Sequence, residues 1–196
     1  MKPSRDRVDT SQVEVSGNTV FVRRYGQGPA ILLVHGFPRT SLMWRSLAPA
    51  LADNHTVICV DLRAYGRTGI PPSTHDHFPY SKRAMAQELV EVMVALGFPT
   101  FTLIGHDRGG RVSYRLALDH PKNVERLAVF DVRCPASLRP TGPGFCWRKR
   151  SRSRSAICSV RPRLPSITLS DMVPSARHSR RIRFNLSRSG PRSWNL

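Results

Sequence analysis

The sequence predicts an α/β protein in which a mostly parallel sheet is covered by helices. Continuous apolar runs at residues 30–34 and 56–60 are typical of strands buried on both faces. Such runs alternate with segments of helical periodicity, which favours a layered α/β architecture. This pattern stops near Arg133. We therefore expect the N-terminal part of an α/β core at residues 1–132, followed at 133–196 by a tail that does not form a domain.

Each element has its own signal. Short β-prone runs flank Ser16-Gly17-Asn18, as in a hairpin. Between Ser81 and Leu96 apolar residues recur every three to four positions, the period of a helix with one buried face, and Gly97 ends it. In chain order we expect a hairpin at 13–15 and 19–23, strands at 30–34, 56–60, 101–104 and 127–130, and helices at 42–51, 81–96 and 108–118. A sheet that stops after this fourth central strand would have an unpaired edge.

Positive charge is concentrated in the tail. The 196 residues include 31 Lys and Arg against 13 Asp and Glu, a net charge of +18. Residues 1–131 account for +4 of it, and residues 132–196 for +14, with Asp171 as their one acid. The tail is rich in Arg, Ser and Pro and has no periodic apolar face, so we expect it to be disordered.

Several classes of protein are not favoured by the composition. No apolar stretch approaches the roughly 18 residues that span a bilayer, and the first residues lack the apolar run of a secretory signal. The four cysteines show neither CxxC pairing nor a histidine at zinc spacing. We expect a soluble, cytoplasmic protein without a disulfide framework, metal or cofactor.

An acidic residue marks the turn from a predicted strand into a helix in Gly105-His106-Asp107-Arg108-Gly109. This is the pattern of a nucleophile elbow with Asp in place of Ser, although the same residues could form a plain turn. Glycines beside such an apex leave room for close packing. A carboxylate nucleophile attacks a saturated carbon or an epoxide and forms an ester, which water then hydrolyses.

The end of the first central strand, His35-Gly36-Phe37-Pro38, offers backbone donors for this chemistry. We expect the N–H groups of Phe37 and Arg108 to form an oxyanion hole. The His35 side chain is expected to brace the loop.

Arg108 and Arg111 lie three residues apart at the start of a helix, where the helix dipole disfavours cations. Such a broken rule is typical of a functional site, and two guanidinium groups beside a nucleophile could bind a substrate carboxylate. A solvated surface position is the alternative for Arg111. Asp131, after the fourth central strand, could orient a general-base histidine or could simply cap a turn.

Four motifs between residues 17 and 132 resemble the haloacetate (fluoroacetate) dehalogenases of the α/β-hydrolase superfamily. They are His35-Gly36-Phe37-Pro38 with Met43-Trp44, Asp61-Leu62-Arg63-Ala64-Tyr65-Gly66, residues 79–86, and Gly105 to Val112. The resemblance implies an incomplete α/β-hydrolase fold that hydrolyses a small haloacid with water and needs no cofactor. It also implies roles for individual residues, namely nucleophile for Asp107, carboxylate binding for Arg108 and Arg111, and the acid that orients histidine for Asp131.

Two alternatives within this picture stay open. Related epoxide hydrolases usually carry Trp after the nucleophile, where this chain has Arg108, so an epoxide hydrolase is the second hypothesis. The resemblance is also compatible with a family-like dimer, without fixing the oligomeric state.

Parts of the family pattern are not recognisable after Asp131. The family continues into a helical cap with a His-Trp pair and a halide-binding Tyr, and then supplies the catalytic histidine. In this chain Cys146-Trp147 is not a His-Trp pair, and His178 is the only histidine after Asp131. We therefore expect this chain to be inactive as a steady-state enzyme.

Two hypotheses account for residues 133–196. A reading-frame change in a GC-rich gene would produce an amino-acid sequence rich in Arg, Ser, Pro and Ala. The abrupt end of the resemblance near Arg133 favours this origin. The alternative is a functional basic tail, in which the segment from Arg148 to Arg154 binds nucleic-acid phosphates.

Overall fold

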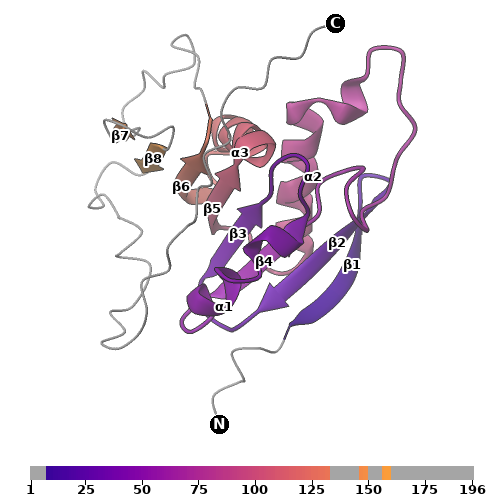
Figure 1. Ribbon diagram of the computed structural model, residues 1–196. Coiled ribbons are helices and arrows are strands. Elements are labelled where there is room, and N and C mark those ends of the chain that lie inside the picture. The colour runs from indigo at the N-terminus through magenta and orange to yellow at the C-terminus, as the bar shows by residue number, and fades with distance from the viewer. Residues whose placement is uncertain (1–7, 133–145, 150–155, 160–196) are drawn as a thin grey trace, which may run out of the picture.

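The computed structural model describes residues 8–132 and two short strands at 146–149 and 156–159. Its strands form one sheet in the order β1-β2-β4-β3-β5-β6-β8-β7 (Figure 1). The strands are β1 (Asp9–Val15), β2 (Asn18–Tyr25), β3 (Ala30–Val34), β4 (Thr56–Val60), β5 (Phe101–His106), β6 (Val124–Phe130), β7 (Cys146–Lys149) and β8 (Ala156–Ser159). The helices are η1 (Ser41–Trp44), α1 (Ala48–Leu51), η2 (Phe78–Tyr80), α2 (Lys82–Ala95) and α3 (Asp107–Asp119).

The centre of the sheet is parallel, as the apolar runs predict. β3 lies between β4 and β5, and Leu32 is in register with Ile58 on one side and Leu103 on the other. β6 adds a fourth parallel strand beside β5, whereas the β1–β2 hairpin joins β4 in the antiparallel sense. The α/β fold class predicted from the sequence is therefore confirmed.

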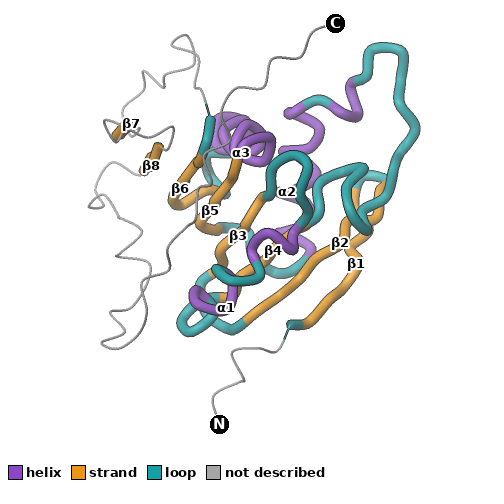
Figure 2. The backbone as a smooth tube through the Cα atoms, in the orientation of Figure 1, coloured by secondary structure: helices purple, strands orange, loops and turns teal. Residues whose placement is uncertain are grey.

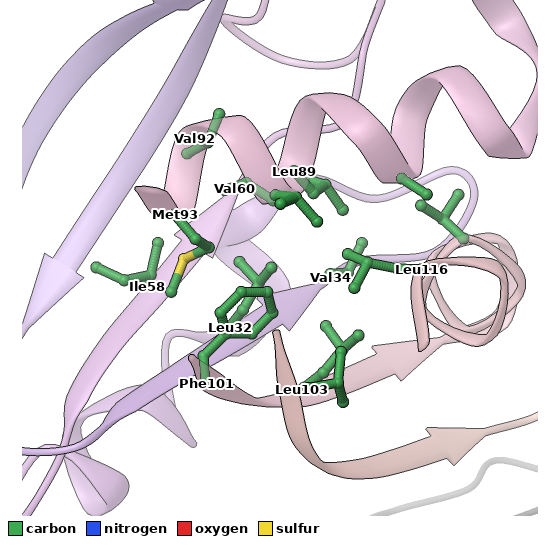
Figure 3. Packing of buried hydrophobic residues seen from close by; sticks show 14 of the residues in the cluster. Leu32, Val34, Ile58, Val60, Leu89, Val92, Met93, Phe101, Leu103 and Leu116 are labelled. Atoms are coloured by element: carbon green, nitrogen blue, oxygen red, sulfur yellow. The ribbon is translucent and has the colours of Figure 1, made fainter. Parts of the chain in front are cut away.

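Helices cover both faces of this sheet. One apolar cluster joins alternate residues of the central strands, such as Leu32 and Val60, to α2 and α3 (Figure 3). The other face, including Leu33, packs against Trp44 of η1 and the short α1. Cys59 of β4 belongs to this second cluster and is fully buried, and burial raises the pKa of its thiol. Burial on both faces explains why the central strands are continuously apolar.

The ends of α2 are fixed by residues that the sequence pattern singles out. The Ser81 hydroxyl accepts a hydrogen bond from the Ala84 N–H at 3.1 Å and so caps the N-terminus. At the other end Gly97 adopts a positive φ of 86°. Its N–H donates to Val94 O, and the Phe98 N–H donates to Met93 O, which together form a Schellman motif. The helix therefore ends where the sequence predicts.

The expected helix at 42–51 is wrong as a single element. The chain forms the 3-10 turn η1 over Ser41–Trp44 and then a separate single-turn helix, α1, over Ala48–Leu51. Pro49 lies in the first turn of α1. Proline has no N–H to extend a preceding helix but fits an N-terminal turn, so it separates the two pieces.

The tail contributes two strands to the sheet, where the sequence predicts only disorder. β8 pairs antiparallel with residues 126–129 of β6, and β7 pairs with β8. The expected free edge of β6 is therefore occupied over four residues. An edge strand presents unpaired N–H and C=O groups that can pair with a β-prone segment. Residues 133–145, 150–155 and 160–196, which include Asp171 and His178, lie outside the described residues.

Within the parts of the chain that the structure describes, no helix is long and apolar enough to cross a membrane.

A long connection links β4 to α2 (Figure 2), and a buried ion pair anchors it. The Arg63 guanidinium donates to Glu88 Oε1 of α2 at 2.7 Å, and their side chains are only 6% and 1% exposed. The Asn18 amide donates to the same oxygen at 2.7 Å. The guanidinium also reaches the carbonyl of Pro79. One carboxylate thus joins the β1–β2 turn, the connection and α2.

Asp61, the first residue after β4, organises the start of this connection. Its carboxylate accepts hydrogen bonds from Ser41 N–H at 2.6 Å and from Arg67 N–H at 3.1 Å. Its carbonyl accepts from the Thr68 hydroxyl at 2.7 Å, and that hydroxyl also accepts from Phe21 N–H. The segment from Asp61 to Thr68 is therefore held in one conformation beside the carboxyl ends of the strands.

We predict that Glu88→Gln lowers the free energy of unfolding by about 3 to 5 kcal/mol, because it leaves the buried Arg63 charge without its partner. The matched control is Glu91→Gln on the same helix, where the carboxylate is only partly buried and the change should stay within about 0.5 kcal/mol. Urea unfolding of the two variants and the parent chain measures both values. Equal losses for the two substitutions would contradict a special role for Glu88.

Candidate active site

Asp107 occupies the turn between β5 and α3 in a strained conformation. Its φ is +46°, whereas His106 before it is extended, so the chain reverses direction within one residue. L-residues other than Gly seldom adopt this left-handed region, and such strain is typical of functional sites. The turn brings the half-buried Asp107 side chain to the carboxyl end of the parallel strands. The sequence prediction of a strand–turn–helix at this point agrees with the structure.

Two glycines allow the end of β3 to approach Asp107. A Cβ atom on Gly36 would lie 2.8 Å from Asp107 Cβ and from His106 Nδ1. A Cβ atom on Gly109 would lie 2.2 Å from the His35 carbonyl oxygen. Real Cβ atoms do not approach so closely, so α3 and the loop after β3 could not pack in this way with larger residues.

The close approach directs a backbone donor at the carboxylate. The Phe37 N–H donates to Asp107 Oδ2 at 3.0 Å. The second donor expected from the sequence, the N–H of Arg108, lies in the first turn of α3, where N–H groups have no partner within the helix. The geometry is thus compatible with charge stabilisation at one Asp107 oxygen.

His35 supports this loop with both ring nitrogens, in agreement with the expectation for its side chain. The Leu62 N–H donates to Nε2 at 2.9 Å, so the proton lies on Nδ1, which contacts the Gly36 carbonyl at 3.0 Å. The residue is fully buried. Burial lowers the pKa of His35, while the Gly36 carbonyl and the Asp61 carboxylate act in the opposite direction. His35 is a structural neutral imidazole in this arrangement.

The two arginines predicted to bind a carboxylate are both exposed on α3. The Arg108 guanidinium lies over two aromatic rings, with its Cζ 5.9 Å from the centroid of Phe37 and 5.8 Å from that of Tyr65. Arg111 follows one turn later, on the same side of the helix.

Asp131 lies one strand away from Asp107. His106 of β5 is in register with Phe130 of β6, so the two acids follow paired residues of adjacent parallel strands. Asp131 has a positive φ of 54° and ends its strand in a bend. His178, the later histidine considered above, lies outside the described residues. Among the described residues no group of three or more potential metal ligands comes together.

Tyr65 lies at the site, although the sequence analysis assigns it no role there. Its ring packs edge-on against His35, with centroids 5.2 Å apart, and faces Arg108. Its position in the sequence could have indicated that it lies near Asp107. It follows Asp61 by four residues, and β4 ends at the same sheet edge as β5. The ring contact itself depends on the path of the connection after β4.

The order of strands and the strained acid at a strand–helix turn are typical of the α/β-hydrolase fold. Residues 29–150 match the family model of the alpha/beta hydrolase fold, and the chain belongs to this family.

Its relatives include a fluoroacetate dehalogenase and several epoxide hydrolases. Over 120 residues the chain is 51% identical to a fluoroacetate dehalogenase of Burkholderia sp., covering 61% of this chain and 40% of the relative. It is 36% identical over 121 residues to a soluble epoxide hydrolase of Corynebacterium sp. strain C12, covering 62% and 41%. The crystal structure of ALR0039 from Nostoc sp. PCC 7120 is similar with a TM-score of 0.64 at 45% identity, covering 66% of this chain and 44% of that one. The chain thus spans about two fifths of the length of the curated relatives it matches.

We predict that acid destabilises the protein partly through His35. Because burial lowers its folded-state pKa, the unfolded chain binds the proton first as pH falls below about 6.5. The stability due to neutral His35 is complete above that pH and is lost below it, with a slope of at most about 1.4 kcal/mol per pH unit. Urea midpoints at pH 7.5, 6 and 5 measure this slope.

His35→Gln retains an acceptor for Leu62 but removes the titration, so its stability should depend less on pH over this range. The control is His75→Gln in an exposed loop, which should keep the slope of the parent chain. An unchanged slope in His35→Gln would refute the assignment.

Proposed function

We propose that this chain contains the nucleophile and the carboxylate-binding residues of a hydrolase that acts on small haloacids. Asp107 is the nucleophile, Arg108 and Arg111 bind the substrate carboxylate, and the N–H groups of Phe37 and Arg108 form the oxyanion hole. The observation that carries this proposal is the exposed Arg108 guanidinium beside a nucleophile whose Oδ2 already accepts a backbone hydrogen bond. The identity to a fluoroacetate dehalogenase supports it.

The charge of the site favours an anionic substrate. Arg108 and Arg111 are adjacent on one side of the first turns of α3, and the helix N-terminus adds a partial positive charge. A guanidinium can bind a carboxylate through two parallel hydrogen bonds. A carboxylate held there would bring its α-carbon close to Asp107, because the three side chains begin within five residues of chain.

In the first step Asp107 Oδ1 attacks the halogen-bearing carbon. A C–O bond forms, the carbon–halogen bond breaks, and halide leaves with the bonding electron pair. Oδ2, which accepts the Phe37 N–H at 3.0 Å, becomes the carbonyl oxygen of the ester. The Phe37 N–H is therefore aimed at the atom that becomes negative when water later attacks the ester carbon.

In the second step water attacks the carboxyl carbon of Asp107 and releases the hydroxyacid. A general base must take the proton from water, and such help is worth about 10² to 10⁴ in rate. We expect Asp131, at the neighbouring strand end, to orient such a base. His35 is not that base, because both of its nitrogens are engaged within the loop. We expect the ester on Asp107 to accumulate in this chain.

An epoxide hydrolase is the second candidate, favoured by the identity to the Corynebacterium enzyme. An epoxide would be opened by the same carboxylate, but it is neutral and gives the two arginines no charge to bind. Its reaction should therefore survive the loss of Arg111.

The test is alkylation of Asp107 by bromoacetate, followed by mass spectrometry of the peptide that contains it. On that peptide we predict one carboxymethyl group, which is not released by further turnover, and no label in Asp107→Asn. Bromoacetate should react faster than bromoacetamide, because only the acid has a charge for the arginines to bind.

Arg111→Lys keeps the charge but loses the bidentate geometry, and should slow the reaction with the acid about tenfold without affecting the amide. The matched control is Arg83→Lys on α2, whose side chain is 64% exposed, and which should change neither rate. Equal rates for acid and amide in the parent chain would refute the proposal. Labelling by a neutral epoxide that persists in Arg111→Lys would support the epoxide hydrolase instead.

A further inference from the structure

The Arg108 guanidinium lies near two aromatic rings. Its Cζ lies 5.8 Å from the Tyr65 centroid and 5.9 Å from the Phe37 centroid, both within the range of a cation–π interaction. The guanidinium stands at the N-terminus of α3, where the helix dipole opposes a positive charge. The electron-rich ring faces offset this repulsion and limit the positions that a long, exposed side chain can adopt.

The two rings differ in how firmly they are held. The Phe37 side chain is 63% exposed, and only its backbone N–H is held, by the hydrogen bond to Asp107. Tyr65 is half-buried, and its ring packs edge-on against His35 at 5.2 Å. Its N–H donates to Leu62 O at 2.8 Å, and its carbonyl accepts from Thr68 N–H at 3.0 Å. Tyr65 is therefore the rigid side of the pair.

Contacts continue from Tyr65 into the sheet. His35, on which its ring packs, is fully buried and bonded through Nε2 to the Leu62 N–H. The Thr68 hydroxyl is bonded to the Asp61 carbonyl at the end of β4. The tyrosine ring is thus attached to β3 through His35 and to β4 through its own loop, so it can hold a neighbouring side chain in a fixed place.

We propose that Tyr65 is a positioning residue that fixes the Arg108 guanidinium beside Asp107 and thereby contributes to selection of carboxylate substrates over neutral ones. This inference rests on the proposed function. Tyr65 acts through its ring face on Arg108 and contacts no reacting atom, so the loss of the ring should affect charged substrates alone.

The experiment compares three variants of the full chain. Tyr65→Phe retains the ring and removes the hydroxyl, whereas Tyr65→Leu and Tyr65→Met remove the ring and leave an apolar side chain of moderate size. The rate of Asp107 alkylation is measured over a range of bromoacetate concentrations, with bromoacetamide as the neutral counterpart. Circular dichroism establishes that each variant is folded, and either ring-less variant is sufficient.

We expect the ring-less variants to lose about two- to fivefold in apparent affinity for bromoacetate, with the rate for bromoacetamide unchanged. Tyr65→Phe should behave like the parent chain towards both reagents. The Arg108 side-chain N–H signal in the NMR spectrum, shifted by the nearby ring, should move in the ring-less variants and stay in Tyr65→Phe. That signal reports on the contact without any substrate.

Different results identify which idea fails. If the parent chain labels Asp107 and prefers the acid, but the ring-less variants keep this preference, the role of Tyr65 is refuted while the proposed function stands. Equal losses for acid and amide would show a merely structural effect and also refute it. If the parent chain shows no preference for the acid, the proposed function and the role of Tyr65 both fail.

Discussion

The close approach of the β3 end to the β5–α3 turn is the constraint on which the rest of the site depends. Gly36 and Gly109 have no side chains, and a Cβ atom on either would force the two segments apart. The Phe37 N–H consequently reaches Asp107 Oδ2 without the participation of any flexible side chain. A donor fixed by the backbone needs little reorganisation when charge develops on its acceptor, and such preorganisation is the main electrostatic advantage of enzyme sites.

Polar contacts of Asp61, Thr68, Arg63 and Glu88 keep the connection after β4 beside this centre. The segment has little regular secondary structure, but side chains satisfy several of its backbone groups. Asp61 and Thr68 fix its first turn, and the buried pair of Arg63 and Glu88 fixes it to α2. A buried ion pair is weak evidence for stability, because desolvation opposes the Coulomb attraction. Here its three-way contact with Asn18 points to a role in holding one loop conformation.

The sequence predicts the sheet well where burial alone decides the structure. The strands at 30–34 and 56–60 match β3 and β4 at both ends, because a strand covered on two faces must be apolar throughout. It fails for the helix at 42–51, where Pro49 interrupts an apolar pattern that would suit one continuous helix. The pairing of β8 with β6 is also missed, because register between distant segments leaves no local pattern.

The candidate site shows the same division. The acid at the turn, the backbone of Phe37 and the neighbouring Arg108 are all visible in short motifs, since each lies within three residues after the end of a strand. The orienting role expected of Asp131 stays a prediction, and its position beside β5 follows from the strand order. The contact between Tyr65 and Arg108 could not be predicted, because 43 positions separate them and only the path of the loop brings them together.

The depth of β4 has a consequence for the reactivity of the protein. Cys59 is the only cysteine before Arg133, and it lies where neither solvent nor reagent has access. Burial raises its pKa, so the sulfur stays protonated at neutral pH, and a protonated thiol is a poor nucleophile. Strands β1 to β6 therefore offer no accessible thiol to carbon electrophiles or mild oxidants. In this part of the molecule, reagents that ordinarily react with thiols can react instead with the carboxylates and imidazoles at the ends of the strands.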